Sequence, residues 1–144
     1  MLSGDEQDLA ELADLVMNVS KLIRARTSTA TATIQLNETE GRVMRLVDLF
    51  PGCTPGDIAA RARLQRTNVS TALSSLESKG MVTRTANGDR TVAVLPTQLA
   101  VDNLNVLKAA WAEQLAIVLK DDLASVRQCN RLLKRLETRL NQVV

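Results

Sequence analysis

The residues of this sequence best suited to chemistry lie between positions 66 and 84, which read RTNVSTALSSLESKGMVTR. The first part of this stretch is rich in Arg, Asn, Thr and Ser, whose side chains donate hydrogen bonds to anionic oxygens such as those of phosphate. An Asn amide can also form two hydrogen bonds with the edge of an adenine. The chain contains no His, so imidazole catalysis is excluded. The stretch therefore indicates binding.

The apolar residues of the same stretch are spaced as on one side of a helix, with Val69, Ala72, Leu73 and Leu76 at i, i+3, i+4 and i+7. A helix over about 66–79 would direct a hydroxyl-rich side outward. Hydroxyl residues are indifferent helix formers, so an outer face made of them needs a reason. Short side chains would let the helix lie close in the major groove of a duplex. The alternative is a face that meets only solvent.

The rotation of 100° per residue in a helix predicts which residues of the 66–79 helix point outward. Asn68, near the helix start, is best suited to an adenine, and Arg66 to a guanine or a phosphate. The residues predicted to point directly outward are Thr67, Thr71, Ser74 and Ser78, and those predicted to flank them are Asn68, Ser70 and Ser75.

Signals before this stretch predict two helices that would support it. Asn37 stands three residues before Glu40, a capping-box pattern that starts a helix running to about residue 50. Thr54 as a cap and Pro55 at the first helical position start a short third helix. A tight connection then leads into the helix at 66–79.

A β-hairpin is predicted after that helix. Gly80 is placed as a left-handed cap, and the β-branched runs MVTRT and TVAVL surround Asn87-Gly88, a strong hairpin turn signal. The order of helix, short turn, helix and hairpin over residues 55 to 95 is that of a winged helix-turn-helix.

Two arginines bracket the hairpin. Arg84 precedes the turn and Arg90 follows it, and an Arg at a wing tip can enter a narrow minor groove. Asp89 cannot bind DNA favourably, but beside Arg90 it is expected to hold the guanidinium in place. The alternative for this pair is an exposed salt bridge contributing well under ~1 kcal/mol.

Both ends of the chain carry apolar seams of helical spacing, one over about 5–26 and others after residue 98. A monomer has little reason to carry such seams at both ends, so we predict a homodimer in which the terminal helices of two copies intertwine. The alternative is an intramolecular hairpin of the terminal helices. The predicted interface residues are Leu9, Leu12, Val16, Val19, Val126, Cys129, Leu133, Leu136 and Leu140.

The predicted fold class is therefore mainly α with a small β-hairpin wing, a winged helix-turn-helix between N- and C-terminal dimerisation helices. Residues 1–36 form the N-terminal dimerisation helix and a linker. Residues 37–96 form the DNA-binding region, and residues 97–144 form the C-terminal dimerisation helices of the same intertwined domain. A chain of 144 residues is the size of one ordinary domain.

Composition argues against several classes of protein. The chain lacks a glycine-rich phosphate loop and cysteine-rich metal spacing, so we expect no enzyme, cofactor or metal. Two cysteines are too few for a disulfide framework, and Cys129 is expected to be a small buried hydrophobe rather than a redox site. No signal peptide or membrane span is apparent, so the expected location is the cytoplasm.

Charge is distributed unevenly along the chain. Between residues 58 and 90, six basic residues stand against two acidic ones, a local balance of +4, whereas the first twenty residues carry five acids and no base. A basic middle fits a polyanionic partner, although a solvated basic face is nearly as common.

The sequence resembles the MarR (multiple antibiotic resistance regulator) family. The matching stretches are LNETEGRVMRLVDLF, TPGDIAARARLQRTNVSTALSSLESKGMVTR and DRTVAVLPT. The resemblance implies a homodimeric transcriptional regulator, usually a repressor, on a palindromic operator. By position it implies groove contacts for Thr67, Asn68 and Thr71, phosphate contacts for Ser70 and Ser74, and a wing arginine at Arg90 held by Asp89.

The sequence departs from the family pattern at the wing. Thr91 follows Arg90 where a second arginine is common, and Leu99 stands where glycine is frequent, so a shallow minor-groove contact is expected. Members of the family bind phenolic or lipophilic effectors. Phe50 and Trp111 are the aromatics available here, and both are more simply interpreted as core, so both the existence and the identity of an effector stay open. The alternative function is a winged-helix module that binds protein instead of DNA.

Overall fold

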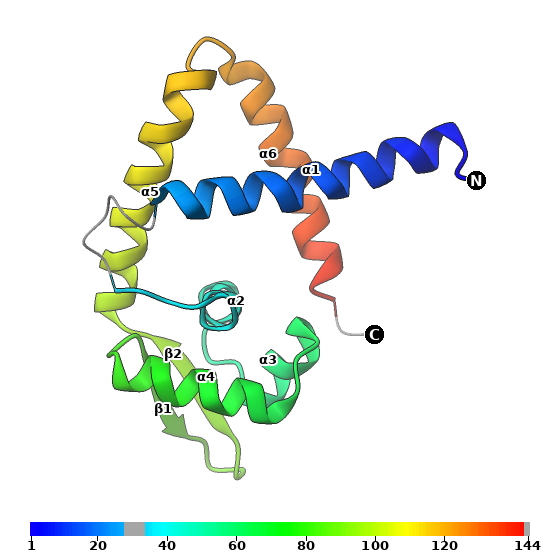
Figure 1. The fold of residues 1–144 in the computed structure, drawn as a ribbon. Coiled ribbons are helices and arrows are strands. Elements are labelled where there is room, and N and C mark those ends of the chain that lie inside the picture. The colour runs from blue at the N-terminus through cyan, green and yellow to red at the C-terminus, as the bar shows by residue number, and fades with distance from the viewer. Residues whose placement is uncertain (28–33, 143–144) are drawn as a thin grey trace.

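The computed structural model describes residues 1–27 and 34–142 and confirms a mainly helical chain with one β-hairpin (Figure 1). The predicted linker falls largely outside the described residues. The elements are α1 (Gly4–Thr27), α2 (Glu38–Leu49), α3 (Pro55–Ala62), α4 (Arg66–Ser78), β1 (Val82–Ala86), β2 (Val92–Pro96), α5 (Gln98–Leu119) and α6 (Leu123–Leu140).

The helix starts follow the local signals in the sequence. At α2, Asn37 Oδ1 accepts from the Glu40 amide at 2.8 Å, and Glu40 Oε1 accepts from the Asn37 amide at 3.3 Å. Thr54 caps α3 in the same reciprocal way, with Pro55 in the first turn. Gly80 ends α4 with φ +76°, a left-handed conformation that glycine adopts without steric cost. Side-chain caps satisfy amides that would otherwise lack partners.

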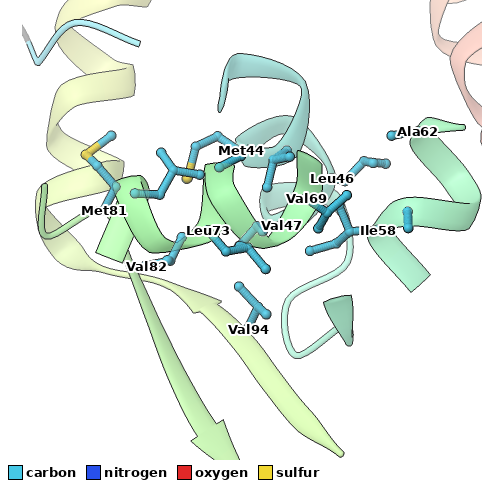
Figure 2. Packing of buried hydrophobic residues seen from close by; sticks show 14 of the residues in the cluster. Met44, Leu46, Val47, Ile58, Ala62, Val69, Leu73, Met81, Val82 and Val94 are labelled. Atoms are coloured by element: carbon cyan, nitrogen blue, oxygen red, sulfur yellow. The ribbon is translucent and has the colours of Figure 1, made fainter. Parts of the chain in front are cut away.

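The hydrophobic core lies between α2, α3, α4 and the hairpin (Figure 2). All four apolar residues that predicted helix α4 are buried, and they pack with side chains such as Val47, Ile58 and Val94. Burying a Leu or Val side chain contributes roughly 1.5–3 kcal/mol. This core therefore fixes which side of α4 is left on the surface.

The hairpin forms, but its turn differs from the expected one. The strands pair antiparallel from Val82 opposite Pro96 to Ala86 opposite Val92, and residues 87–91 connect them. The left-handed residue is Arg90 with φ +70°, and not Gly88. Asn87 donates to Thr91 through both its backbone and its side-chain amide, at 2.8 and 2.9 Å. These bonds close a loop longer than a two-residue Asn-Gly turn.

The terminal helices form an open frame above this lobe. Helix α1 crosses the space between α5 and α6, and α6 returns towards α2 and α3 (Figure 1). No described residue of α6 is buried, and Thr27 is the one buried residue of α1 among those described. Leu9 and Leu140 are 66% and 67% exposed. Packing within one chain therefore leaves most of the predicted seam residues exposed and half-buries Leu12, Val126 and Leu133.

Three expectations about side chains need correction or refinement. Cys129 is exposed in the single chain and not buried. Phe50 and Trp111 are half-buried: Phe50 packs on the core, whereas Trp111 lies beside a small hollow on the inner side of α5. Across the described residues, no helix combines the length and apolar character that a membrane span requires.

Candidate nucleic-acid interface

The outward side of α4 is on the surface of the molecule, as predicted. Thr67, Asn68, Ser70, Thr71 and Ser74 are all exposed, and the core covers only the opposite side of the helix. The Thr71 hydroxyl donates to the Thr67 carbonyl at 3.0 Å, which leaves its oxygen free to accept. The structure thus presents a continuous face of short polar side chains that no other described part of the chain covers.

Ser75 does not belong to this face, although the sequence placed it at the edge. It is half-buried, and its hydroxyl donates to Glu40 Oε2 at 3.1 Å. Lys79 donates to the same carboxylate oxygen at 2.9 Å and to the Gln35 carbonyl at 2.8 Å. Glu40 is only 3% exposed. This cluster ties the second half of α4 to the start of α2.

The Glu40 carboxylate keeps its charge inside this cluster. Burial alone would raise its pKa, but hydrogen bonds from Lys79, the Asn37 amide and Ser75 outweigh burial and hold the pKa below its usual value. A carboxyl with a lowered pKa in the folded state stabilises the fold above its unfolded pKa. That contribution is lost as the pH falls through the folded pKa.

We therefore expect Glu40→Gln to lower the free energy of unfolding at neutral pH by about 1–2 kcal/mol, since a charge-assisted hydrogen bond is lost. The difference from the wild type should shrink between roughly pH 5 and pH 3, where Glu40 itself becomes protonated. Urea unfolding at several pH values measures it. A difference that stays constant with pH would contradict a charged Glu40.

Arg66 lies where α3 and α4 meet. A Cβ added at Gly56 would be 3.4 Å from Arg66 Nη2, so the absence of a side chain there gives the guanidinium its space beside the first turn of α3. Arg66 is exposed and forms no ion pair with any described residue. Its position at the edge of the α4 face is consistent with an anionic contact.

The hairpin arginines differ from each other. Arg84 forms a bidentate ion pair with Glu77 of α4, at 3.1 and 3.2 Å, which holds the pKa of Glu77 below its usual value. Its guanidinium therefore already has a partner within the chain. Arg90, at the turn, is exposed and has no carboxylate partner among the described residues.

Asp89 does not hold Arg90, contrary to the expectation from the sequence. Its Oδ1 accepts from the Thr91 amide at 3.2 Å and from the Thr91 hydroxyl at 2.5 Å. These bonds lower the pKa of Asp89 and stabilise the turn. The reason is local: the left-handed backbone of Arg90 brings Thr91 back towards Asp89. Thr91 stands where a second arginine is common in the MarR family. Its amide and hydroxyl bind the Asp89 carboxylate that was expected to hold Arg90.

The surroundings of Cys53 disfavour the reactive thiolate form of its side chain. Burial, and secondarily the charge of Asp57, raises the pKa of the Cys53 thiol, so it stays protonated at neutral pH. The Cys53 carbonyl also accepts from the Val94 amide at 2.9 Å, in an isolated bridge to β2. Among the described residues, no group of three or more His, Cys, Asp or Glu side chains is placed so that it could bind a metal ion.

Sequence reasoning missed the long-range pairings that orient the lobe. Arg45 forms an ion pair with Glu137 of α6 at 2.7 Å, and Arg61 donates to the Asn141 carbonyl at 2.7 Å while it lies 4.0 Å from the Phe50 ring centre. Nothing in the local pattern around these arginines identifies such partners, because they are separated by up to 92 residues.

Comparison with known proteins agrees with this geometry. The model of the MarR family matches residues 34–90. A putative transcriptional regulator of Pseudomonas aeruginosa has a similar structure, with a TM-score of 0.73 and 22% identity over 96% of this chain and 98% of that one. Among curated proteins, no significant match is found.

Two further structures carry ligands. A MarR family protein of Mycobacterium tuberculosis, in complex with p-aminosalicylic acid, is 27% identical over 87% of this chain and 97% of that one, with a TM-score of 0.61. A mutant of MepR from Staphylococcus aureus, bound to an oligodeoxyribonucleotide, is 16% identical over 88% and 96%, with a TM-score of 0.62.

Proposed function

Because its winged-helix region and its fold are those of the MarR family of transcription regulators, we propose that this chain is a homodimeric, sequence-specific DNA-binding regulator. In this proposal it represses transcription from a palindromic operator. Each copy places α4 in a major groove and its hairpin at the adjacent minor groove, and a two-fold dimer presents both helices about one helical turn of DNA, ~34 Å, apart.

The observation that carries the proposal is the uncovered polar face of α4. Asn68 is exposed near the start of the helix and its side chain forms no hydrogen bond with any described residue, so the side-chain amide is free to pair with a base. Ser70 and Ser74 are exposed beside it and suit phosphate oxygens. The cluster around Glu40 holds the far end of the helix, so the face is presented by a rigid element.

The wing has an unequal pair of arginines, and we assign them different roles. Arg90 contacts the minor groove, where a narrow groove attracts an unpaired guanidinium. Arg84 holds the hairpin against α4 through Glu77 and contributes to DNA binding mainly by positioning the wing. Thr91 stands where a second arginine is common at the tip of the wing, which favours a shallow contact between the wing and the minor groove.

Arg90→Ala should weaken binding to the operator roughly tenfold, since one charge contact is lost per copy, and it should leave the dimer intact. Arg84→Ala is the matched control and should cost only about twofold to threefold, because the exposed pair it breaks contributes little. Fluorescence anisotropy with labelled duplex measures both. Equal losses for the two variants would argue against the assignment.

The dimer half of the proposal follows from the uncovered seams of α1 and α6. Each fully buried Leu or Val would contribute roughly 1.5–3 kcal/mol to association, and the predicted seam residues include several that are exposed in one chain. Neither seam is covered by an intramolecular hairpin, so a second copy is the simplest cover.

A small-molecule effector of unknown identity is a secondary part of the proposal. The hollow beside Trp111 and Leu107, between α5 and the segment before α2, measures ≈ 180 Å³. This is below the about 300–1,000 Å³ typical of ligand pockets, so it suits a single-ring compound at most. The relative crystallised with p-aminosalicylic acid supports that size class.

The experiment that tests the function is a band-shift competition with DNA flanking the protein's own coding region. We expect the labelled fragment to resist displacement by excess random duplex, since specific sites bind about 10³-fold or more tighter than non-specific ones. Displacement by equal amounts of random duplex, together with co-purification of a protein partner, would favour the winged-helix protein-interaction module instead.

A further inference from the structure

A groove of ≈ 850 Å³, which we name the cationic groove, lies between α6 on one side and α2 and α3 on the other. Leu46 and Leu133 belong to its apolar floor, and Val16 of α1 borders it. The ion pair between Arg45 and Glu137 spans it. The groove is thus the place where the DNA-binding lobe faces the terminal helices.

The charge of the groove is strongly one-sided. Its lining contains five cationic side chains and one carboxylate, a balance of +4, namely Arg42, Arg45, Arg61, Arg63, Lys134 and Glu137. Only Arg45 is neutralised. Arg42 and Arg61 donate to the backbone carbonyls of Ala62 and Asn141, which leaves their charges uncompensated. Arg63 and Lys134 are exposed and have no ion-pair partner among the described residues.

The same chain carries a segment of opposite charge. The first half of α1 extends beyond the body of the molecule (Figure 1), and its acids include Asp5, Asp8, Glu11 and Asp14. Within the described residues, none of these four forms a hydrogen bond or ion pair through its side chain. The chain therefore carries both an acidic helical segment without side-chain partners among the described residues and a groove with an excess of positive charge.

The acids share a face with apolar side chains. Asp8, Glu11, Leu12 and Leu15 fall at i, i+3, i+4 and i+7, so they lie on one side of α1. Leu15 is 51% exposed. This mixed acidic and apolar face complements a groove with a cationic rim and an apolar floor.

Size and symmetry agree with this match. Two turns of helix with a diameter of about 10 Å occupy roughly 850 Å³ and contain about seven residues, the length of the segment from Asp8 to Asp14. Val16 borders the groove of its own chain. If two α1 helices meet near Val16 about a two-fold axis, the second copy's residues 8–14 begin within one turn of that point.

We propose that the acidic first half of α1 from a second copy docks in the cationic groove and so ties one subunit's N-terminal helix to the other subunit's DNA-binding lobe. The inference rests on the proposed homodimer and adds a contact to it. Because this contact joins α1 of one copy to α2 and α3 of the other, it fixes how the two α4 helices are spaced.

A zero-length carbodiimide crosslink tests the contact directly, because Lys134 supplies an amine in the groove. Dimers mixed from ordinary and ¹⁵N-labelled chains are crosslinked, digested and analysed by mass spectrometry. We expect mixed-label crosslinks between Lys134 and the peptide containing Asp8, Glu11 and Asp14. Lys134→Arg keeps the charge and should abolish them. Crosslinks within one label only, such as Lys134 to Glu137, would contradict the proposal.

Charge reversal provides the second test. Asp8→Lys with Glu11→Lys should raise the dimer dissociation constant about tenfold at roughly 50 mM salt, and much less at roughly 500 mM, where salt screens the attraction. Adding Arg63→Glu and Lys134→Glu to the same chain should restore dimerisation to within about threefold of wild type. Analytical ultracentrifugation measures each constant.

The outcomes separate the two levels of inference. A wild-type chain that is monomeric at all concentrations would overturn the homodimer and the groove contact together. A wild-type dimer that lacks the crosslink and is insensitive to reversal would overturn the groove contact alone. The anionic dye 1-anilinonaphthalene-8-sulfonate tests another occupant. If the dye binds the wild-type dimer and its binding is lost only in Arg63→Glu/Lys134→Glu, the groove is a binding site for a small anion and the proposal is overturned.

Discussion

Asn68→Ala should weaken operator binding by roughly 30-fold to 10⁴-fold, because a bidentate adenine contact contributes about 1–3 kcal/mol and a dimer makes it twice. The side chain is exposed, lies near the start of α4 and forms no hydrogen bond with any described residue, so its removal leaves the fold unchanged. The loss should fall on one base pair per half-site, where preference for the original base disappears. Titrations against a set of single-base operator variants measure this.

Ser70→Ala is the matched control for base reading. Ser70 is exposed on the same helix and suits a phosphate oxygen, so its loss should weaken all operator variants by a similar, smaller factor. If Asn68→Ala also weakens every variant equally, Asn68 contacts the DNA backbone and does not read a base.

Leu136→Glu should convert the dimer to monomers and abolish specific binding. Leu136 is 38% exposed on the seam of α6, and a second copy would bury it. The loss of two buried Leu side chains, one per copy, should raise the dimer dissociation constant at least roughly a hundredfold, since each contributes roughly 1.5–3 kcal/mol. Ultracentrifugation and DNA titration on the same samples measure both effects.

Gln128→Glu is the matched control, because it introduces the same residue on the same helix away from the seam. It should leave the dimer and the operator affinity within about twofold of wild type. A monomeric Gln128→Glu variant, or a dimeric Leu136→Glu variant, would show that the seam of α6 is not the interface.

Much of the fold could be predicted because its determinants are local. The capping boxes at Asn37 and Thr54 and the left-handed Gly80 each act within a few residues of the chain, and each is present as expected. The spacing of Val69 and Leu73 likewise fixes which side of α4 enters the core, and hence which side is left for a ligand. The spacing of apolar residues and the helix caps depend on nearby residues, so they can be predicted without the positions of distant segments.

The partners of charged side chains could not be predicted in the same way. The sequence predicts that Asp89 holds its neighbour Arg90, but the turn backbone directs the Asp89 carboxylate to Thr91. Arg84 pairs with Glu77, which lies on a different element. Such pairings depend on the relative placement of elements, and that placement is set by the core. The α4 face was therefore predictable, whereas the wing chemistry was not.

The seams at the termini illustrate a second limit. Their spacing indicates burial, but spacing does not say against which surface, and Cys129 is exposed in one chain where burial was expected. The acids of α1 were visible in the sequence as a charge excess. Their match to a groove made by α3 and α6 becomes apparent only when those helices are placed in space.

The salt dependence of duplex binding reports how many phosphates the α4 faces and the wings neutralise. If two α4 faces and two wings neutralise phosphates together, the logarithm of the dissociation constant for DNA flanking the coding region should rise with the logarithm of salt concentration with a slope of at least about 4. Binding should be measurable at roughly 50 mM salt. No binding at that concentration, or a slope near zero, would show that the hydroxyl-rich face of α4 does not meet nucleic acid.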